Sequence, residues 1–272
     1  MNQTLQNSVM QSQQRLCSEE IPHVIATVVR TNSSIAAKPG MKALVLENGE
    51  FEGGWLGGGC VTSAVRSAAK EAIQTGEAIL VCMRPEELIN EEMNTDMVTL
   101  ARNGCPSKGS LDIFVEPVIP LPELIVFGNG PVALSLLYIA RGFGFKLTVC
   151  GKIDGQELKV DNCFSTATEM VQHSRSSANK YIVVATQGTG DVASLICALS
   201  IDHSYVAFVG SRRKFASYEK KLLGSGISSK TLKKVFSPAG LNINAVTPEE
   251  IALSIMAEIV QIRRMKKKRF NE

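Results

Sequence analysis

The chain has 272 residues and a net charge of +3, with 44% hydrophobic and 20% charged residues. That balance predicts a folded protein with a substantial core, which we expect to form two domains, and it excludes a disordered chain. No run of about eighteen apolar residues occurs, so we expect neither a membrane-spanning helix nor a membrane partner. Residues 1–14 are polar and lack the apolar centre of a secretory signal, so we expect a cytoplasmic protein.

Cysteine and histidine usage bears on metal binding and catalysis. The seven cysteines form no CxxC pair, and only three histidines are present. In a reducing compartment such cysteines are expected to be free thiols. Their spacing supplies no zinc ligand cluster, and no histidine follows the pattern of a Ser/His/Asp triad. We therefore predict no metal site and no catalytic residue.

Basic residues concentrate near the C-terminus, at Arg263–Arg264 and Lys266–Arg269. Such a run can contact nucleic acid or an acidic protein surface. It can also be the solvated end of a helix, where cations suit the negative pole of the helix dipole. Because neither interleaved aromatic residues nor nucleic-acid motifs accompany the run, we favour the helix end and expect no nucleic-acid partner.

The first strand signals form a hairpin. Val24–Arg30 and Ala43–Leu46 are rich in β-forming residues. Asn48-Gly49 follows and predicts a type I′ turn, which leads into a return strand at Glu50–Trp55.

A helix and two more strands complete the first half. After Gly59 the apolar spacing becomes helical, and Gly76 is its stop signal. The residues expected on its buried face are Val61, Val65, Ala68, Ala72 and Ile73. Ala78–Met83 and Asp112–Glu116 are predicted strands, and a polar helical stretch is predicted from Pro85.

Pro117, Pro120 and Pro122 interrupt the chain. Proline fixes φ and lacks an N–H donor, so we predict neither helix nor central strand there. We place a domain boundary in this segment. The sequence thus predicts an α/β fold: an N-terminal α/β domain over residues 1–119 and a Rossmann-like domain with a parallel sheet over residues 120–272.

The second half reads as repeated strand–helix units. Glu123–Phe127 is an apolar run that predicts a strand buried on both faces. Further strands are predicted at Lys146–Cys150 and, as apolar runs, at Tyr181–Ala185 and Tyr205–Val209. A helix over Val132–Arg141 connects the first two. Alternation of this kind is typical of a right-handed parallel sheet.

Gly128-x-Gly130-x-x-Ala133 follows the first of these strands and opens a helix. Glycines in this context allow a tight turn and a close approach of the backbone to a pyrophosphate at the helix N-terminus. The acid that holds a ribose at the end of the second strand is missing, since Gly151 and Lys152 stand there. Lys152 could pair with the phosphate of NADP, the site could have lost nicotinamide binding, or the turn could be purely structural.

Gly57-Gly58-Gly59-Cys60 stands at a strand-to-helix junction. Three glycines leave backbone amides unshielded, and the positive end of a helix favours an anion, including a thiolate. Cys60 is therefore a candidate reactive or sulfur-carrying thiol. Cysteine is also often a small buried hydrophobe, and the spacing alone does not choose between these readings.

Gly210-Ser211-Arg212-Arg213-Lys214 follows the last predicted strand. A glycine-serine turn with three cations predicts an anion or phosphate site, on the same sheet edge as Gly128. Cations at a helix N-terminus oppose the dipole and need another reason to be there, although a solvated basic helix start is the alternative. Thr186-Gln187-Gly188 and Asp191 are weaker candidates on that edge.

Together these segments resemble the XdhC/CoxI family, accessory factors of xanthine dehydrogenase and related molybdenum hydroxylases. The resemblance covers residues 21 to about 262 and rests on several motifs in the right order. The motifs are Ala26–Val29, Lys38-Pro39-Gly40, Gly57–Cys60, Phe127–Ala133, Gly210–Lys214, Ser237–Leu241, Thr247–Ala252 and Ser254–Glu258.

The resemblance implies a non-catalytic chaperone that binds molybdenum cofactor (molybdopterin) and helps equip it with its terminal sulfido ligand. It further implies delivery to an apo-hydroxylase, docking of a cysteine desulfurase, and a homodimer. Cys60 matches the family's glycine-rich cysteine and is the candidate for cofactor or sulfur contact. A pterin phosphate would suit the amides of Gly57–Gly59, or the Gly128–Gly130 turn with Arg212 and Arg213.

Some positions depart from the family pattern. Gln187 and Thr189 replace its usual histidines, and Gly151 replaces the strand-end acid. The family has a second cysteine near the end of the first domain. In this chain Cys105 lies about two residues away from that position, and Ser107 is the residue that aligns most nearly with it.

Two other functions stay open. An NADP-dependent oxidoreductase would use Gly128, Gly130 and Lys152, although no obvious proton donor accompanies them. A scaffold without a working ligand site would recruit a desulfurase through the basic tail.

Overall fold

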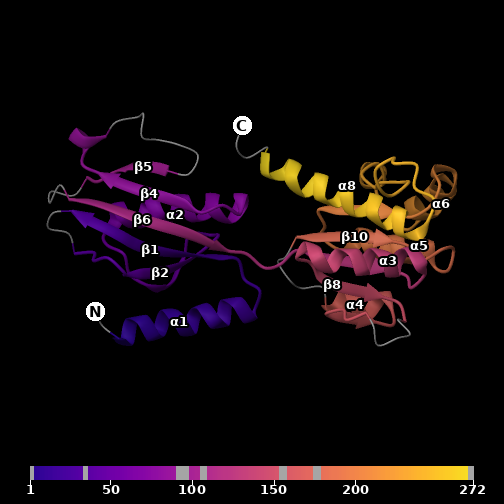
Figure 1. Ribbon diagram of the computed structural model, residues 1–272, viewed down its shortest axis with the longest axis horizontal. Coiled ribbons are helices and arrows are strands. Elements are labelled where there is room, and N and C mark those ends of the chain that lie inside the picture. Colours follow the sequence, from indigo (N-terminus) through magenta and orange to yellow (C-terminus); the bar gives the residue numbers. More distant parts are fainter. Residues whose placement is uncertain are drawn as a thin grey trace. The chain divides into compact units, whose positions relative to one another are not determined.

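The computed structural model describes residues 3–32, 36–89, 98–104, 109–152, 158–173 and 179–268. The chain divides into two compact units, the first ending at Pro120 and the second beginning at Leu121 (Figure 1). The predicted fold class is confirmed, since the first unit has a mixed sheet and the second an all-parallel one. No helix in the described ranges is long and apolar enough to cross a membrane.

The first unit is built on a six-stranded sheet of order β3-β2-β1-β6-β4-β5. Among its described strands, β4 and β5 are the one parallel pair. Its elements are α1 (Gln3–Ser18), β1 (His23–Asn32), β2 (Lys42–Leu46), β3 (Phe51–Gly54), α2 (Gly59–Thr75), β4 (Ile79–Arg84), the 3₁₀ turn η1 (Glu86–Leu88), β5 (Val98–Arg102) and β6 (Ser110–Val118).

Two helices cover opposite faces of this sheet. All five residues predicted on the apolar face of α2 are buried, and Gly76 ends the helix in the left-handed conformation, with φ 71°. Alternate residues of β2 divide between the helices: Ala43 and Val45 pack with α2, and Leu44 packs with Val9 and Leu16 of α1. Helix α1 was not predicted from the sequence, because its few apolar residues are spread through a polar segment.

The predicted hairpin is confirmed, but its turn is not type I′. That turn requires a positive φ at both central residues, and here Gly49 has one (φ 82°) while Asn48 does not. The Gly49 N–H instead donates to the Leu46 carbonyl, and Asn48 Oδ1 accepts from the Glu50 N–H at 2.9 Å. A left-handed glycine after a tight turn produces this longer loop.

Two further expectations were wrong in the first unit. Pro117 lies inside β6 and pairs with Val24 of β1. The pairing of β6 with β4 stops at Val115, so Pro117 is on a stretch bonded on one side only, where a missing N–H is tolerated. The helical stretch expected from Pro85 is a single 3₁₀ turn in the described residues.

The second unit contains a five-stranded parallel sheet of order β11-β10-β7-β8-β9. Every residue of β7, β10 and β11 is buried, as the apolar runs predicted. Its elements are β7 (Glu123–Phe127), α3 (Pro131–Ala140), the 3₁₀ turn η3 (Arg141–Phe143), β8 (Lys146–Cys150), β9 (Asn162–Phe164), α4 (Ala167–His173), β10 (Lys180–Val184), α5 (Asp191–Ser200), β11 (Tyr205–Phe208), α6 (Arg212–Gly224), α7 (Ser229–Leu232) and α8 (Pro248–Lys268).

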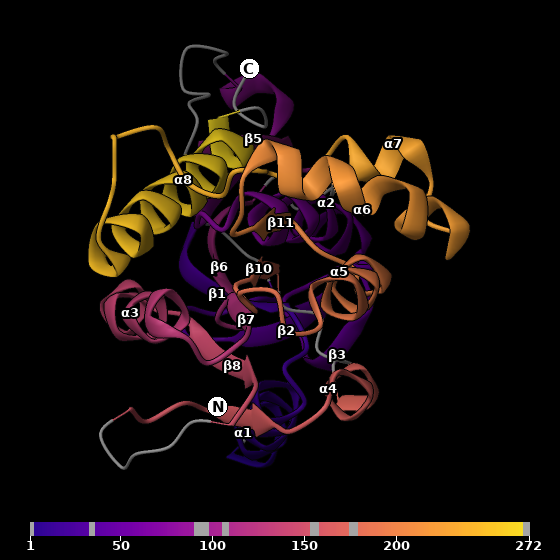
Figure 2. The ribbon, with the colours of Figure 1, turned by 90° about the vertical axis from the view of Figure 1, so that its right-hand side faces the viewer.

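Helices cover both faces of the parallel sheet. Helices α3 and α8 pack on one face, and α4, α5 and α6 on the other, as Figure 2 shows. The basic run near the C-terminus begins on α8, where the guanidinium of Arg263 lies over the Phe145 ring and donates to the Phe143 carbonyl. The strand order places a switch point between β7 and β10, the usual ligand position in such sheets.

Candidate functional site

The glycine run of the first unit ends at the start of α2. Gly58 is the N-cap of this helix, so Cys60 lies in its first turn. A Cβ built on Gly58 or Gly59 meets nothing within 4 Å, so the backbone is open to a ligand on that side. The Cys60 side chain is exposed there, and the N-terminal end of α2 favours a bound anion.

Cys60 lies close to the end of β5. Its Sγ is 3.8 Å from the position that a Cβ on Gly104 would occupy. Asn103, the preceding residue, is buried, and its Nδ2 donates to the Gly109 carbonyl at 2.6 Å. Cys105 and Ser107 lie outside the described residues.

The described cysteines differ in access to solvent. Cys17, Cys60 and Cys163 are exposed, whereas Cys82 and Cys197 are buried. Burial raises the pKa of the Cys82 thiol, and the nearby Asp112 carboxylate raises it further. Burial raises the pKa of Cys197 to about 11. Cys60 is therefore the exposed thiol that also stands at a glycine-rich helix start.

The glycine turn of the second unit lies at the carboxyl end of β7. Gly128 has φ 117°, and a Cβ there would lie 2.4 Å from the Ala185 carbonyl oxygen. Gly130 is the N-cap of α3 with extended backbone, and Ala133 is fully buried between α3 and the sheet. Close backbone packing therefore accounts for Gly128 and Ala133 whether or not a ligand binds.

The side chain of Gln187 lies against this turn. A Cβ on Gly130 would be 2.7 Å from Gln187 Cδ and Oε1. Gln187 follows β10, which neighbours β7, so it stands at the switch point of the sheet. Lys152 is exposed, and its carbonyl accepts from Asn129 Nδ2 at 2.9 Å. The space that a pyrophosphate would approach beside Gly130 thus holds an uncharged amide.

A buried carboxylate organises the loop after β10. Asp191, 3% exposed, accepts hydrogen bonds from Thr186 Oγ1, the Gly188 N–H and Tyr218 OH, and pairs with Lys214 Nζ at 2.7 Å. Burial alone would raise the pKa of Asp191, but these partners outweigh burial and lower the pKa to about 2. The carboxylate fixes the loop and supplies the reason for a cation in the first turn of α6.

The three basic residues after β11 have different surroundings. Ser211 is the N-cap of α6, and its hydroxyl accepts from the Lys214 N–H at 3.2 Å. Lys214 turns to Asp191, and Arg212 lines a pocket of about 910 Å³. Arg213 is exposed and is not among the residues that line this pocket. The Lys214 Nζ lies 4.0 Å from the position that a Cβ on Gly188 would occupy.

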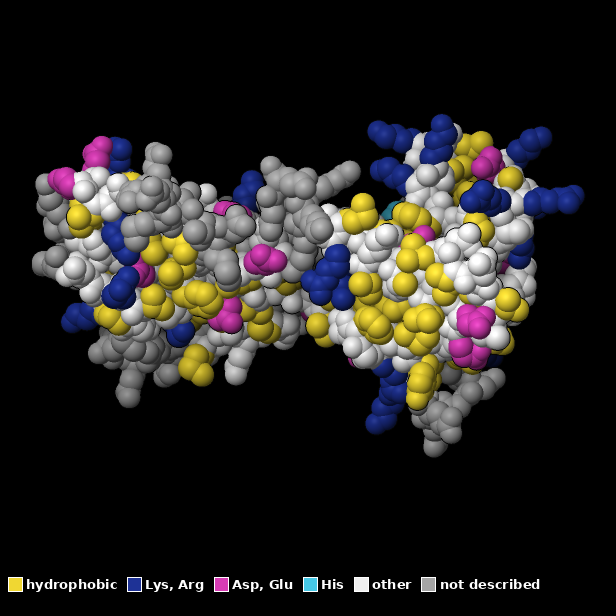
Figure 3. Space-filling view, turned by 45° about the horizontal axis from the view of Figure 1, so that its top comes forward, with side chains coloured by type: hydrophobic (Ala, Val, Ile, Leu, Met, Phe, Trp, Pro, Cys, Tyr) yellow, Lys and Arg dark blue, Asp and Glu magenta, His cyan; other side chains and the backbone are white. Residues whose placement is uncertain are grey.

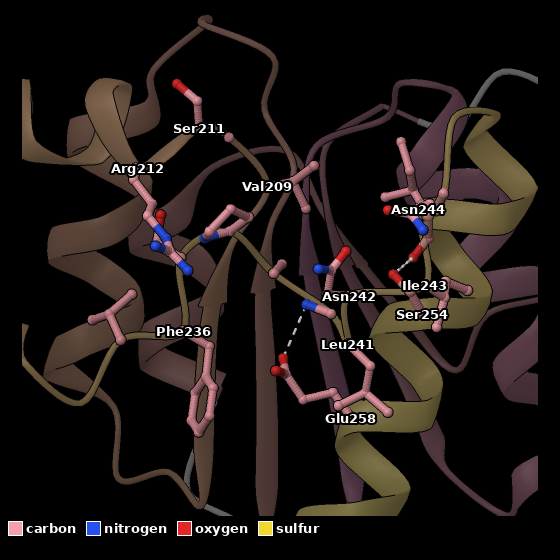
Figure 4. Close-up of a pocket in the computed structure, with 18 residues that line it drawn as sticks. Val209, Ser211, Arg212, Phe236, Leu241, Asn242, Ile243, Asn244, Ser254 and Glu258 are labelled. Carbon is pink, nitrogen blue, oxygen red and sulfur yellow. Dashed lines mark hydrogen bonds between the residues drawn. The ribbon is translucent and has the colours of Figure 1, made fainter.

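The other walls of this pocket come from the loop over residues 236–245 and from α8 (Figure 4). They include Phe236, Ser237, Gly240 and Glu258. The sequence did not predict these as site residues, although three of them lie within the Ser237–Leu241 and Ser254–Glu258 motifs, by which the chain resembles the family. No group of His, Cys, Asp or Glu side chains able to hold a metal ion occurs in the described part of the chain.

Family models match both halves of the chain. The model of the XdhC Rossmann domain matches residues 124–259, which is half of the 272 residues, and the model of the XdhC and CoxI family matches residues 16–83. The chain belongs to the XdhC/CoxI family.

Two curated proteins are similar to this member of the family. The uncharacterized protein YqeB of Escherichia coli is 25% identical over 262 residues, covering 92% of this chain and 45% of YqeB. A probable xanthine dehydrogenase subunit of Bacillus subtilis is 31% identical over 160 residues, covering 56% of this chain and 46% of that protein. The chain thus spans about half the length of the curated relatives it matches.

A solved structure also aligns with the chain. It is described as a xanthine dehydrogenase from Bacillus halodurans and is 18% identical, with a TM-score of 0.43. The alignment covers 95% of this chain and 96% of that one.

Proposed function

We propose that this XdhC/CoxI protein is a non-catalytic accessory factor that binds molybdenum cofactor. In this role it aids sulfuration of the cofactor and its insertion into a molybdenum hydroxylase of the xanthine dehydrogenase type. The observation that carries the proposal is the match of family models to both halves of the chain. The cofactor, when bound, supplies the molybdenum centre on which the hydroxylase depends.

The start of α2 has the chemistry that such a cofactor requires. A pterin phosphate is an anion, and Gly58 and Gly59 leave the backbone open at the positive end of a helix. The exposed Cys60 adds a thiol at the same place, and cysteine thiolates act as nucleophiles and metal ligands. We assign cofactor contact to Gly57–Cys60, and no step of catalysis to the chain.

Replacement of Cys60 tests this assignment. We expect Cys60→Ala to weaken binding of isolated molybdopterin by about tenfold or more, equivalent to about 1.4 kcal/mol, and to lower maturation of a partner hydroxylase in proportion. Cys17→Ala is the matched control, because Cys17 is also an exposed thiol of the first unit. Undiminished binding and maturation with Cys60→Ala would show that the thiol has no such role.

The proposed partners are an apo-hydroxylase and a cysteine desulfurase, and the proposed assembly is a homodimer. Family membership supports association with a xanthine dehydrogenase. We expect light scattering to give twice the 29.3 kDa chain mass and a tagged chain to retain a desulfurase. A monomer mass at micromolar concentration would contradict the dimer.

A further inference from the structure

The pocket at the carboxyl end of β11 has no part in the function proposed above. Its volume, about 910 Å³, lies near the upper limit of the roughly 300–1,000 Å³ that small-molecule sites occupy. In Figure 4, Arg212 lies on one side of the pocket and Ile243 and Asn244 lie on the opposite side, with Asn242 between them. A ligand that contacts both sides is therefore extended.

One end of the pocket suits a carboxylate group. Gly210, Ser211 and Arg212 line it, and they stand at the N-terminus of the 13-residue helix α6. Backbone amides of a first helical turn and a guanidinium both donate to carboxylate oxygens. Residues 212–234 contain eight Lys or Arg and one acid, Glu219, and Figure 3 shows basic side chains gathered on the second unit where α6 lies. Such a field attracts an anionic group to this end.

A buried carboxylate lies in the wall that α8 forms. Glu258 is 8% exposed, and its Oε2 accepts hydrogen bonds from Tyr205 OH at 2.5 Å and from the Gly240 N–H at 3.0 Å. No described residue donates to its Oε1, so this oxygen can accept an N–H from a ligand. Like charges repel, so the anionic group of a ligand belongs at Arg212 and a neutral N–H group belongs at Glu258.

The loop over residues 236–245 offers polar groups that suit a peptide backbone. Asn242 and Asn244 line the pocket and are exposed. A side-chain amide both donates and accepts, which matches the alternating N–H and C=O groups of an extended peptide. The buried Ser237 hydroxyl lacks a partner among the described residues, and such a group gains from a ligand that supplies one.

Exposed apolar side chains lie among these polar groups. Phe236 is 38% exposed and Ile243 is 48% exposed, although both line the pocket. Phe236 packs against buried Tyr205 with ring centroids 4.9 Å apart, so it is held in place from behind. Exposed apolar surface that is rimmed by polar residues is typical of sites that bind other proteins. It favours a ligand with an apolar side chain.

We propose that this pocket binds the C-terminal segment of a partner protein, as an extended peptide with a free carboxylate and an apolar last residue. Arg212 and the start of α6 hold the carboxylate. Glu258 Oε1 accepts a backbone N–H, and Phe236 and Ile243 contact the apolar side chain. Capture of a terminal carboxylate by backbone amides is a recurring mode of peptide recognition. The proposal does not depend on the function assigned to Cys60, because that residue lies in the first unit.

Calorimetry on the full chain tests the ligand class. The probes are acetylated tetrapeptides, each of three alanines followed by leucine, phenylalanine or glycine, prepared with a free carboxylate and with a C-terminal amide. We expect a free acid that ends in leucine or phenylalanine to bind at least about tenfold more tightly than its amide. The free acid that ends in glycine should bind more weakly, because it has no apolar side chain.

Replacement of Arg212 tests the carboxylate contact. Arg212→Gln is expected to weaken binding of the free acid at least about tenfold and to leave the amide unchanged, since it removes the cation that holds the carboxylate. Arg213→Gln is the control, because it removes a neighbouring exposed cation that does not line the pocket. An equal effect of the two variants would reduce the site to surface charge and contradict the proposal.

Replacement of Ile243 tests the apolar contact. Ile243→Ser is expected to reduce the preference for leucine over glycine at the last position by about threefold or more, since it removes apolar surface from the pocket. Val246→Ser is the control, because Val246 directly follows the same loop, is 81% exposed and does not line the pocket. Loss of the preference in both variants would show that Ile243 has no specific contact with the ligand.

Two results with the unmodified protein would overturn the proposal. The first is the absence of binding for the free acids that end in leucine and phenylalanine at about 1 mM, the limit of weak specific binding. If inorganic phosphate bound at that concentration while these peptides did not, the pocket would be a site for a small anion. The second is equal binding of free acid and amide. Each leaves the Cys60 test intact.

Discussion

Gly128→Ala is expected to destabilise the second unit by about 3 kcal/mol or more, even with no ligand present. A Cβ at this position would lie 2.4 Å from the Ala185 carbonyl oxygen, and φ is 117°. The carbonyl belongs to the backbone after β10, and the Cβ is fixed to the backbone after β7, so neither atom can move cheaply. Thermal unfolding followed by circular dichroism should show a midpoint lower by roughly 6–12 °C.

Gly130→Ala is the matched control within the same motif. Its backbone is extended (φ −74°, ψ 175°), which any residue adopts, and the three atoms nearest to its Cβ would all belong to the amide end of Gln187. A rotamer change of Gln187 relieves that contact, so we expect a loss of no more than about 1 kcal/mol. If the two variants lost stability equally, backbone packing would not be the reason for Gly128.

Asp191→Asn is expected to lower stability at neutral pH by about 2–3 kcal/mol, since the buried carboxylate is paired and accepts three hydrogen bonds. The folded-state pKa of about 2 is below the ordinary value of 3.8. The ionised group therefore stabilises the fold fully above about pH 4 and loses that contribution as the pH falls toward 2. Its size is about 2 kcal/mol.

Urea unfolding at several pH values measures this contribution. The unmodified protein should lose stability between about pH 4 and pH 2 more steeply than Asp191→Asn does. Glu219→Gln changes the net charge equally on exposed surface of α6, so it serves as control. Parallel pH profiles for the protein and Asp191→Asn would show that the Asp191 network does not act through its charge.

Much of the fold could be predicted from the sequence because its signals are local. The apolar runs Glu123–Phe127 and Tyr205–Phe208 are strands buried on both faces, and the spacing of Val61, Val65 and Ala68 predicted the buried face of α2. Prediction from the sequence failed where the environment of a residue depends on a strand far away in the chain. Pro117 is tolerated in β6 because β4 ends its pairing at Val115, a fact about a strand some thirty residues away.

In the candidate sites, too, local sequence signals could be predicted and long-range contacts could not. Glycine runs and the basic turn marked Gly57–Cys60, Gly128 and Arg212, because these signals are contiguous in sequence. The sequence could not separate Lys214, which pairs with Asp191, from Arg212, which lines the pocket. It also could not place Phe236 and Glu258 beside Tyr205, since those contacts span 31 and 53 residues.

By itself, therefore, the sequence determined the α/β class, the family and the positions where backbone is left open by glycine. These depend on periodicity, turn chemistry and motif order, which neighbouring residues carry. Only the tertiary structure decided what each motif faces: Gln187 beside Gly130, the Ala185 carbonyl against Gly128, and Glu258 across from Arg212. Those facts depend on strand order and helix packing, which bring together side chains that no local pattern relates.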